Sequence, residues 1–394
     1  MEKSLKLHSD LAEDVATSSS FRQFKIKHFH LDLSVDFEKR TLRGTETLQL
    51  KCIQDSQSEL LLDIHPSLSM QEVSYCRSED DSDSVKVEFM TRNFTSYGTT
   101  LVVKFPSPCK IEEQFRVVVK FHASDGPGVC WLDPEQTAGK VKPYVFTQGQ
   151  AVLNRSFFPC FDTPAVKSTY SAAVKVPDGF TAVMSASKGE HRMADNTFLF
   201  TMEQPIPSYL VALAVGDLVS AEVGPRTRVW TEPCLLQAAK QEYDGVIEEF
   251  LVVGEKLFGP YVWGRYDVLF MPPSFPFGGM ENPCLTFVTP CLLVGDRSLA
   301  DVIVHEICHS WFGNLVTNLR LRWAQIVAKN HHQPGYQHVR SFLSCQGKQK
   351  YTLPVYRALW NGSEETRALA TEIFSATSHQ LHVNVRNYVK KILA

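Results

Sequence analysis

The sequence has no hydrophobic run long enough to cross a membrane. Its longest apolar stretches, such as residues 209–215, fall well short of the roughly 20 residues that a membrane-spanning helix needs. Residues 1–20 have no apolar core between a basic start and a cleavage site, so they do not resemble a secretory signal peptide. We therefore expect a protein that is not inserted into a membrane.

An excess of positive charge is also missing. The chain has 40 Lys and Arg against 43 Asp and Glu, so nothing points to nucleic acid or to an anionic membrane surface as a partner. Its 10 cysteines form no Cys-x-x-Cys pair, which is typical of reduced thiols rather than of a disulfide framework. We expect a cytoplasmic protein. The sequence leaves unconventional secretion open and does not indicate the oligomeric state.

What is present indicates a globular protein of two or three domains. The chain has 394 residues, of which 44% are hydrophobic. Residues 1–20 are polar and predict a disordered tail. Residues 21–218 contain short stretches in which apolar and polar residues alternate, separated by turn clusters at 80–84 and 126–128. This pattern predicts one large antiparallel β domain over 21–218.

Helical spacing begins after residue 218. Residues 235–258 predict one helix, 265–271 a short strand, and 298–317 a second helix that begins with a weak Ser298/Asp301 capping box. Residues 319–394 are basic and amphipathic and predict several short helices. The fold class is therefore α+β, with the β domain followed by a mixed segment over 219–318 and a helical segment over 319–394.

The strongest chemical pattern is His305-Glu306-Ile307-Cys308-His309. Residues four apart lie on one face of a helix, so both imidazoles can reach the same metal ion. Glu306 then lies where it could take a proton from metal-bound water, as in zinc peptidases. The simpler interpretation is two unconnected histidines on a buried helix. The apolar character of the helix, at 299–303, fits a buried catalytic element.

A glycine-rich segment precedes this helix. Gly278-Gly279-Met280-Glu281-Asn282 combines a backbone that can approach a ligand closely with a carboxylate that could bind a free amino group. Taken alone, the segment is more simply a turn. Its place, with Glu281 24 residues before His305, makes a substrate-binding role more specific.

Together these motifs resemble a known family. Gly-Gly-Met-Glu-Asn followed by His-Glu-x-x-His-x-Trp is similar to the signature of the gluzincin zinc aminopeptidases, and residues 147–167 and 272–290 strengthen the resemblance. The resemblance implies a thermolysin-like catalytic domain, an armadillo-like C-terminal segment and peptide substrates with a free N-terminus, from which Arg or Lys is released. One Zn²⁺ per chain is the implied cofactor of the intact family.

The resemblance also implies roles for individual residues. His305 and His309 would bind zinc, Glu306 would be the general base, and Glu281 would hold the substrate amine. The residues implied to line the substrate pocket are Gly149, Gln150, Gly278, Gly279 and Met280. Lys348 and Lys350 would meet the substrate carboxylate, although a solvated basic turn is their simpler interpretation.

The chain departs from the family at the third zinc ligand. The family pattern places a glutamate nineteen positions after the second histidine, where this chain has Ala328. The sequence after Asn318 instead resembles the start of the family's last helices, as if two ends of a longer protein were joined at Asn318–Leu319. The catalytic domain over 219–318 is therefore predicted to be truncated.

The missing ligand predicts weak or absent zinc binding and little activity. A catalytic zinc needs three protein ligands plus water, and nothing in the sequence positions His331, His332 or Glu364 as a substitute. The alternative function is a non-catalytic peptide-binding or regulatory fragment from a spliced transcript or a gene-prediction error. Epoxide hydrolysis, known from another branch of the family, would meet the same defect. Loss of neighbours should also expose apolar residues of the 298–317 segment.

Overall fold

The computed structural model describes residues 14, 16–77, 83–95, 97–317, 356–357, 359–360, 364–378 and 383–393. The chain forms two compact units, one of Ser19–Thr317 and one of Met1–Ser18 with Asn318–Ala394. Ala328, Lys348 and Lys350 lie outside the described residues. The predicted domain boundaries remain predictions, although strand β16 begins at Val219, where the mixed segment was expected to start.

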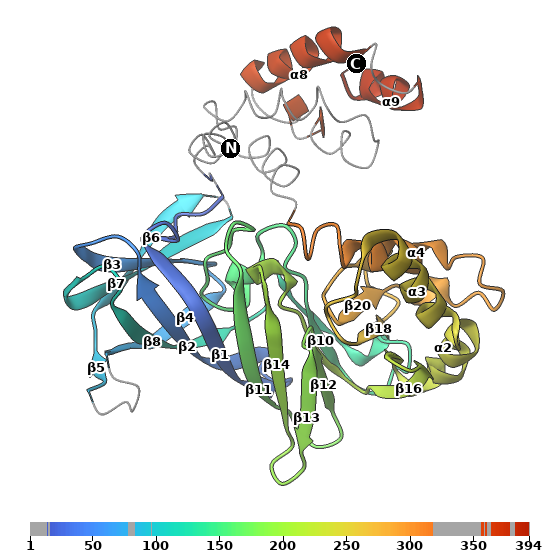
Figure 1. The fold of residues 1–394 in the computed structure, drawn as a ribbon, viewed down its shortest axis with the longest axis horizontal. Coiled ribbons are helices and arrows are strands. Elements are labelled where there is room, and N and C mark those ends of the chain that lie inside the picture. Colours follow the sequence, from blue (N-terminus) through green and yellow to red (C-terminus); the bar gives the residue numbers. More distant parts are fainter. Residues whose placement is uncertain are drawn as a thin grey trace. The chain divides into compact units, whose positions relative to one another are not determined.

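The larger unit begins with a twisted eight-stranded sheet (Figure 1). Its order is β13 (Lys188–Arg192), β14 (Thr197–Ile206), β11 (Ser168–Lys175), β1 (Phe24–Asp36), β2 (Thr41–Cys52), β8 (Gln114–Ala123), β4 (Leu68–Cys76) and β5 (Val85–Lys86). Buried residues alternate with more exposed ones along the longer strands, so one face of the sheet is buried. In β8 the buried set includes Phe115, Val117, Val119 and Phe121. The prediction of a large β-rich N-terminal domain is therefore confirmed.

The prediction of a purely antiparallel domain is wrong at the centre of this sheet. β1 pairs with β2 in antiparallel register but with β11 in parallel register, with His28 opposite Thr169. β2 follows β1 through a short turn, which forces an antiparallel pair. β11 begins only at Ser168, long after β2 ends at Cys52, and a connection of that length can return the chain in the same direction as β1.

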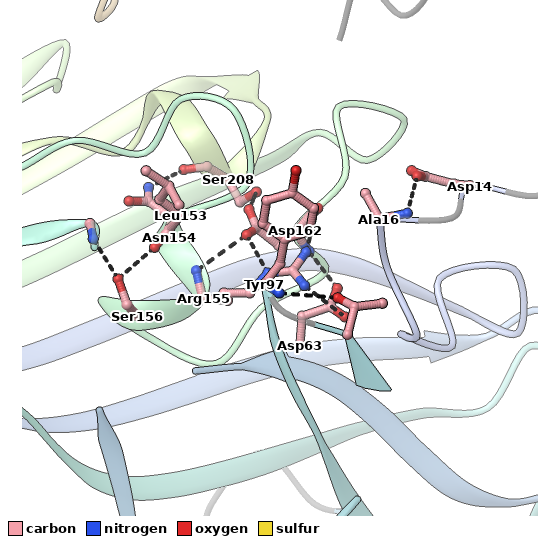
Figure 2. Close-up of polar contacts among 12 residues, drawn as sticks. Asp14, Ala16, Asp63, Tyr97, Leu153, Asn154, Arg155, Ser156, Asp162 and Ser208 are labelled. Atoms are coloured by element: carbon pink, nitrogen blue, oxygen red, sulfur yellow. Dashed lines mark hydrogen bonds and ion pairs between the residues drawn. The ribbon is translucent and has the colours of Figure 1, made fainter. Parts of the chain in front are cut away.

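Two smaller sheets complete the β-rich part. β3 (Gln57–Ile64), β7 (Gly98–Cys109) and β6 (Phe89–Thr95) form one, and β12 (Thr181–Met184), β15 (Leu213–Gly216), β10 (Tyr144–Thr147) and β9 (Val129–Leu132) form the other. A buried ion network joins β3 to the segment after β10 (Figure 2). Arg155 Nε donates to Asp162 Oδ2 at 2.9 Å, and its Nη1 lies 3.9 Å from Asp63 Oδ1 on β3. Ser208 Oγ donates to the other Asp162 oxygen at 2.9 Å.

The mixed segment is a five-stranded sheet with three helices (Figure 1). The strand order is β16 (Val219–Gly224), β17 (Thr227–Thr231), β18 (Tyr266–Phe270), β20 (Leu285–Val288) and β19 (Gly279–Met280); the helices are α2 (Leu236–Tyr243), α3 (Val246–Phe258) and α4 (Asp301–His309). The single helix predicted over 235–258 is therefore wrong. Gly245, at φ 74°, adopts the left-handed conformation that glycine favours and separates α2 from α3.

The second helix is shorter than predicted. α4 begins after Ala300, which makes no side-chain cap, so the Ser298/Asp301 capping box is not formed. The helix ends at His309 because the chain folds back, with Gly313 at φ 126° and its N–H donated to the Val316 carbonyl at 2.8 Å. The turn leaves Phe312 56% and Val316 67% exposed, in agreement with the expected apolar surface.

The smaller unit contains the helices α8 (Glu364–Thr377) and α9 (Val383–Leu393). Their armadillo-like arrangement stays a prediction. No helix among the described residues is long and apolar enough to span a bilayer. The nine cysteines of the described part of the chain are free thiols.

Candidate metal and peptide site

Helix α4 brings the two predicted zinc histidines together. The Nε2 atoms of His305 and His309 lie 3.2 Å apart, and the two rings are edge-on with an interplanar angle of 86°. Two nitrogens bound tetrahedrally to one zinc at the usual bond length are about 3.3 Å apart. The spacing of this pair therefore fits a shared metal ion.

The tautomer of His309 also suits metal binding. Its Nδ1 lies 2.8 Å from the Phe312 carbonyl oxygen, which can only accept a hydrogen bond. Nδ1 therefore carries the hydrogen, and the lone pair is left on Nε2, the atom that faces His305. The turn that ends α4 thus orients His309, the predicted metal ligand, as well as ending the helix.

Glu306 is buried between α4 and the edge strand β19. Its side chain is 6% exposed and packs directly against Gly279. A Cβ atom at residue 279 would overlap the Glu306 carboxylate, so only glycine allows this approach. The close approach brings the glycine-rich segment and the zinc helix into one site, as their spacing in the sequence predicts.

Glu281 follows β19 and is 8% exposed. Gln150 Nε2 donates to its Oε1 at 3.2 Å, and Asn314 Nδ2 donates to its backbone carbonyl at 2.7 Å. Glu281, Glu306 and His309 each offer a metal-ligand atom, and these atoms all lie within 4.8 Å of one another. The site therefore gathers two carboxylates beside the His309 imidazole.

A loop from the β-rich part forms one wall of the site. Gln148 Nε2 lies 3.2 Å from Met280 Sδ, and Gln150 reaches Glu281. Gly149 between them packs so closely on the Tyr209 carbonyl that a Cβ atom would overlap it. The structure thus brings Gly149, Gln150, Met280 and Glu281 together. A Cβ at Gly278 would meet nothing within 4 Å. The substrate contacts predicted for Gly149, Gln150, Met280 and Glu281 stay predictions.

Several residues that support α4 were not identified from the sequence. Trp263 Nε1 donates to the Ser310 carbonyl at 3.0 Å, and Lys167 Nζ donates to the Asn314 carbonyl at 2.7 Å. Burial lowers the pKa of Lys167. Asn314 in turn holds Glu281. Lys167 lies inside the conspicuous 147–167 stretch, but the partner is 147 positions away and no local pattern reveals it.

A zinc ion would fit the two histidines of α4. The third ligand expected by the family pattern falls at Ala328, which cannot bind a metal. Among the described residues, the carboxylates gathered with His309 are Glu281 and Glu306. A His-Glu-x-x-His helix with converging imidazoles and a buried carboxylate against a glycine-rich edge strand defines the site of a metallopeptidase.

Comparison with known proteins gives the family. Residues 25–210 match the peptidase M1 N-terminal domain, and residues 241–390 match the peptidase family M1 domain. The chain belongs to the M1 peptidase family.

Individual relatives agree with this assignment. Aminopeptidase B of Rattus norvegicus is 65% identical over 323 residues, covering 79% of this chain and 50% of that protein. Leukotriene A-4 hydrolase of Xenopus laevis is 45% identical over 313 residues, covering 77% of this chain and 50% of that protein. A yeast LTA4 hydrolase solved in complex with bestatin superimposes with a TM-score of 0.73 at 32% identity, covering 97% of this chain and 64% of its own. The chain spans about half the length of the curated relatives it matches.

Proposed function

We propose that this chain carries the amine-binding part and two metal ligands of an aminopeptidase site, and that it lacks the third ligand needed for efficient turnover. The observation that carries the proposal is the convergence of Glu281, Glu306 and His309 within 4.8 Å. In its intact form the protein would release N-terminal Arg or Lys from peptides. Support for this comes from its 65% identity to a protein named aminopeptidase B.

In the complete site each residue would have one task. Glu281, held by Gln150 and Asn314, would bind the substrate's free ammonium group. Such a contact fixes the first peptide bond near α4 and excludes substrates with a blocked N-terminus. Glu306, buried against Gly279, would accept a proton from the attacking water and pass it to the leaving amine. When bound at His305 and His309, zinc would lower the pKa of that water and polarise the peptide carbonyl.

The deficiency follows from ligand number. A catalytic zinc is held by three protein ligands and keeps one position for water. Two imidazoles alone hold the ion weakly, and the residue at the expected third position is Ala328. The proposal therefore includes a shortening of the catalytic domain at Asn318–Leu319. Action in the cytoplasm is part of the same proposal.

Restoring the absent segment tests the proposal. The corresponding catalytic segment of a curated aminopeptidase B would be inserted between Asn318 and Leu319, and hydrolysis of an arginyl fluorogenic amide would be measured. We expect turnover to appear in the restored protein only. In that protein Glu306→Gln should abolish turnover while zinc content is kept, because the base is lost and the ligands remain.

A matched control is Glu249→Gln, which removes one negative charge from an exposed position of α3 and should leave turnover of the restored protein unchanged. If the unaltered chain hydrolyses the amide at a rate close to that of the restored protein, the proposed deficiency is wrong. A non-catalytic peptide-binding fragment would show binding of arginyl peptides without turnover.

A further inference from the structure

The turn that follows α4 holds two residues of the site at once. The Phe312 carbonyl accepts a hydrogen bond from His309 Nδ1 at 2.8 Å, and Asn314 Nδ2 donates to the Glu281 carbonyl at 2.7 Å. Asn314 is only 2% exposed, so its contact is shielded from water. The conformation of one short turn therefore fixes both His309, the predicted metal ligand, and Glu281, the residue proposed to bind the substrate amine.

The backbone of this turn is satisfied partly from within and partly from outside. The N–H groups of residues 314–316 each donate to the carbonyl five residues earlier in the chain. The carbonyls of Asn314 and Leu315 take hydrogen bonds from a distant segment of the chain instead. A shielded carbonyl that loses its donor costs free energy, so the conformation of the turn depends on these outside contacts.

Lys167 is the donor to both carbonyls. Its Nζ lies 2.7 Å from the Asn314 oxygen and 3.1 Å from the Leu315 oxygen. Burial lowers the pKa of Lys167, and within the described part of the chain no carboxylate pairs with its ammonium group. The half-buried charge is thus directed at the turn, and hydrogen bonds from a charged donor are stronger than those from a neutral one.

The large sheet fixes the position of Lys167. The lysine directly precedes β11, and Thr169 at the start of this strand pairs with His28 of the central strand β1. The hydrogen bond from Lys167 to Asn314 spans 147 positions in the sequence. It therefore ties the turn after α4 to the most rigid part of the β-rich domain.

We propose that Lys167 is a positioning residue of the candidate site, which acts by clamping the turn after α4. Through Asn314 it fixes Glu281. Through the Phe312 carbonyl it selects the tautomer of His309. The first of these effects rests on the proposed function, in which Glu281 binds the substrate amine, whereas the second does not. Lys167 itself touches neither the substrate nor the metal in this assignment.

Lys167→Met tests the assignment in the full chain freed of metal, because methionine keeps most of the length of lysine and loses the donor. Binding of arginine amide would be followed by calorimetry, with N-acetyl arginine amide as the ligand that has no free amine. We expect the Kd of arginine amide to rise about tenfold, near the lower end of what a hydrogen bond to a charged group contributes. Lys167→Arg keeps a charged donor and should bind arginine amide within about threefold of the unaltered chain.

The tautomer of His309 gives a second readout that needs no ligand. In the unaltered chain at pH 8, nitrogen-15 NMR should show the ring hydrogen on Nδ1, where the Phe312 carbonyl accepts it. In Lys167→Met we expect a shift towards the form with the hydrogen on Nε2, because the carbonyl is no longer held in place. A His309→Asn sample identifies the signal among the 13 histidines.

A double-mutant cycle separates positioning from a general loss of stability. Asn314→Ala removes the amide that holds Glu281, and adding Lys167→Met to it should weaken arginine amide binding by less than about twofold more. Lys142→Met is the matched control, since Lys142 Nζ also donates to a backbone carbonyl at 2.7 Å, but to that of Gly179 instead of the turn. This control should leave both readouts unchanged.

The possible results distinguish this proposal from the proposed function. An unchanged His309 tautomer or an unchanged arginine amide Kd in Lys167→Met would overturn the positioning role, and so would fully additive losses in the cycle. If the unaltered chain does not bind arginine amide, the amine role of Glu281 is wrong, and the tautomer measurement alone decides the role of Lys167. If circular dichroism shows that Lys167→Met does not fold, Lys167→Gln takes its place with the same criteria.

Discussion

The buried Arg155 network offers a stability prediction with a defined size. Arg155 is fully buried, with its guanidinium 2.9 Å from Asp162 and 3.9 Å from Asp63. Arg155→Leu would leave these two carboxylates facing each other without the guanidinium. Removing one partner of a buried ion pair costs about 3–5 kcal/mol. We expect the free energy of unfolding to fall by that amount at pH 8.

The loss should depend on pH in a direction that the structure sets. Burial raises the pKa of Asp162, and this effect outweighs the opposing effect of the nearby Arg155 guanidinium, which lowers that pKa. Without the arginine, the pKa of Asp162 in the folded protein should rise further. When the pKa of Asp162 is higher in the folded protein than in the unfolded chain, the folded protein binds the Asp162 proton more tightly. The loss of stability caused by Arg155→Leu is therefore largest above the folded-state pKa, and it shrinks as pH falls through that pKa. The recovery can reach about 1.4 kcal/mol per pH unit for one proton.

Urea unfolding followed by tryptophan fluorescence, from pH 8 to pH 5, measures both effects. Arg43→Leu is the control, because Arg43 is exposed and its ion pair with Asp36, at 3.9 Å, should contribute at most about 1 kcal/mol. Adding Asp162→Asn to Arg155→Leu should restore part of the loss at pH 8, since it removes one of the two charges. A loss below about 1 kcal/mol at pH 8, or one that is the same at pH 5, would refute the reasoning.

Two further substitutions test the packing around α4. Gly279→Ala would push a methyl group into the Glu306 carboxylate. In the restored protein we expect kcat to fall by about 100-fold, because displacing a catalytic group by about 1 Å has an effect of that size. An unchanged kcat would contradict this expectation. Trp311→Ala would empty the space that the indole fills against Gly254 and Phe258. We expect the free energy of unfolding, measured in urea, to fall by about 3–5 kcal/mol. A fall below about 1 kcal/mol would show that the indole is not part of the core.

The β-rich fold could be predicted because its signal is local. Alternation along a strand reports which face is buried, and it does so whatever the strand's neighbours are. The parallel pairing of β1 with β11 could not be predicted in this way, since His28 meets Thr169 only through the path taken by the chain between them. The break at Gly245 was missed because the apolar spacing continues across it, while the backbone conformation does not.

The residues of the site likewise fall into those that a local pattern predicts and those that it does not. Residues four apart on a helix must share a face, so His305 and His309 followed from spacing alone. The wall formed by Gln150 and the supports from Lys167 and Trp263 depend on contacts between distant segments, and only the motif resemblance indicated the first of them. The end of α4 was misplaced for a similar reason, because the apolar residues after His309 serve a turn rather than a helix.

The residue proposed to bind the substrate amine and the residues proposed to bind the metal are held by different contacts. Glu281 is held by Gln150 from the β-rich part and by Asn314 from the turn after α4, and both lie within the compact unit Ser19–Thr317. The two histidines are likewise positioned inside that unit, His309 by the Phe312 carbonyl. None of these contacts depends on a residue at position 328. The side chains of Glu281 and His309 are thus held in place by contacts that do not involve the position where the family has its third ligand.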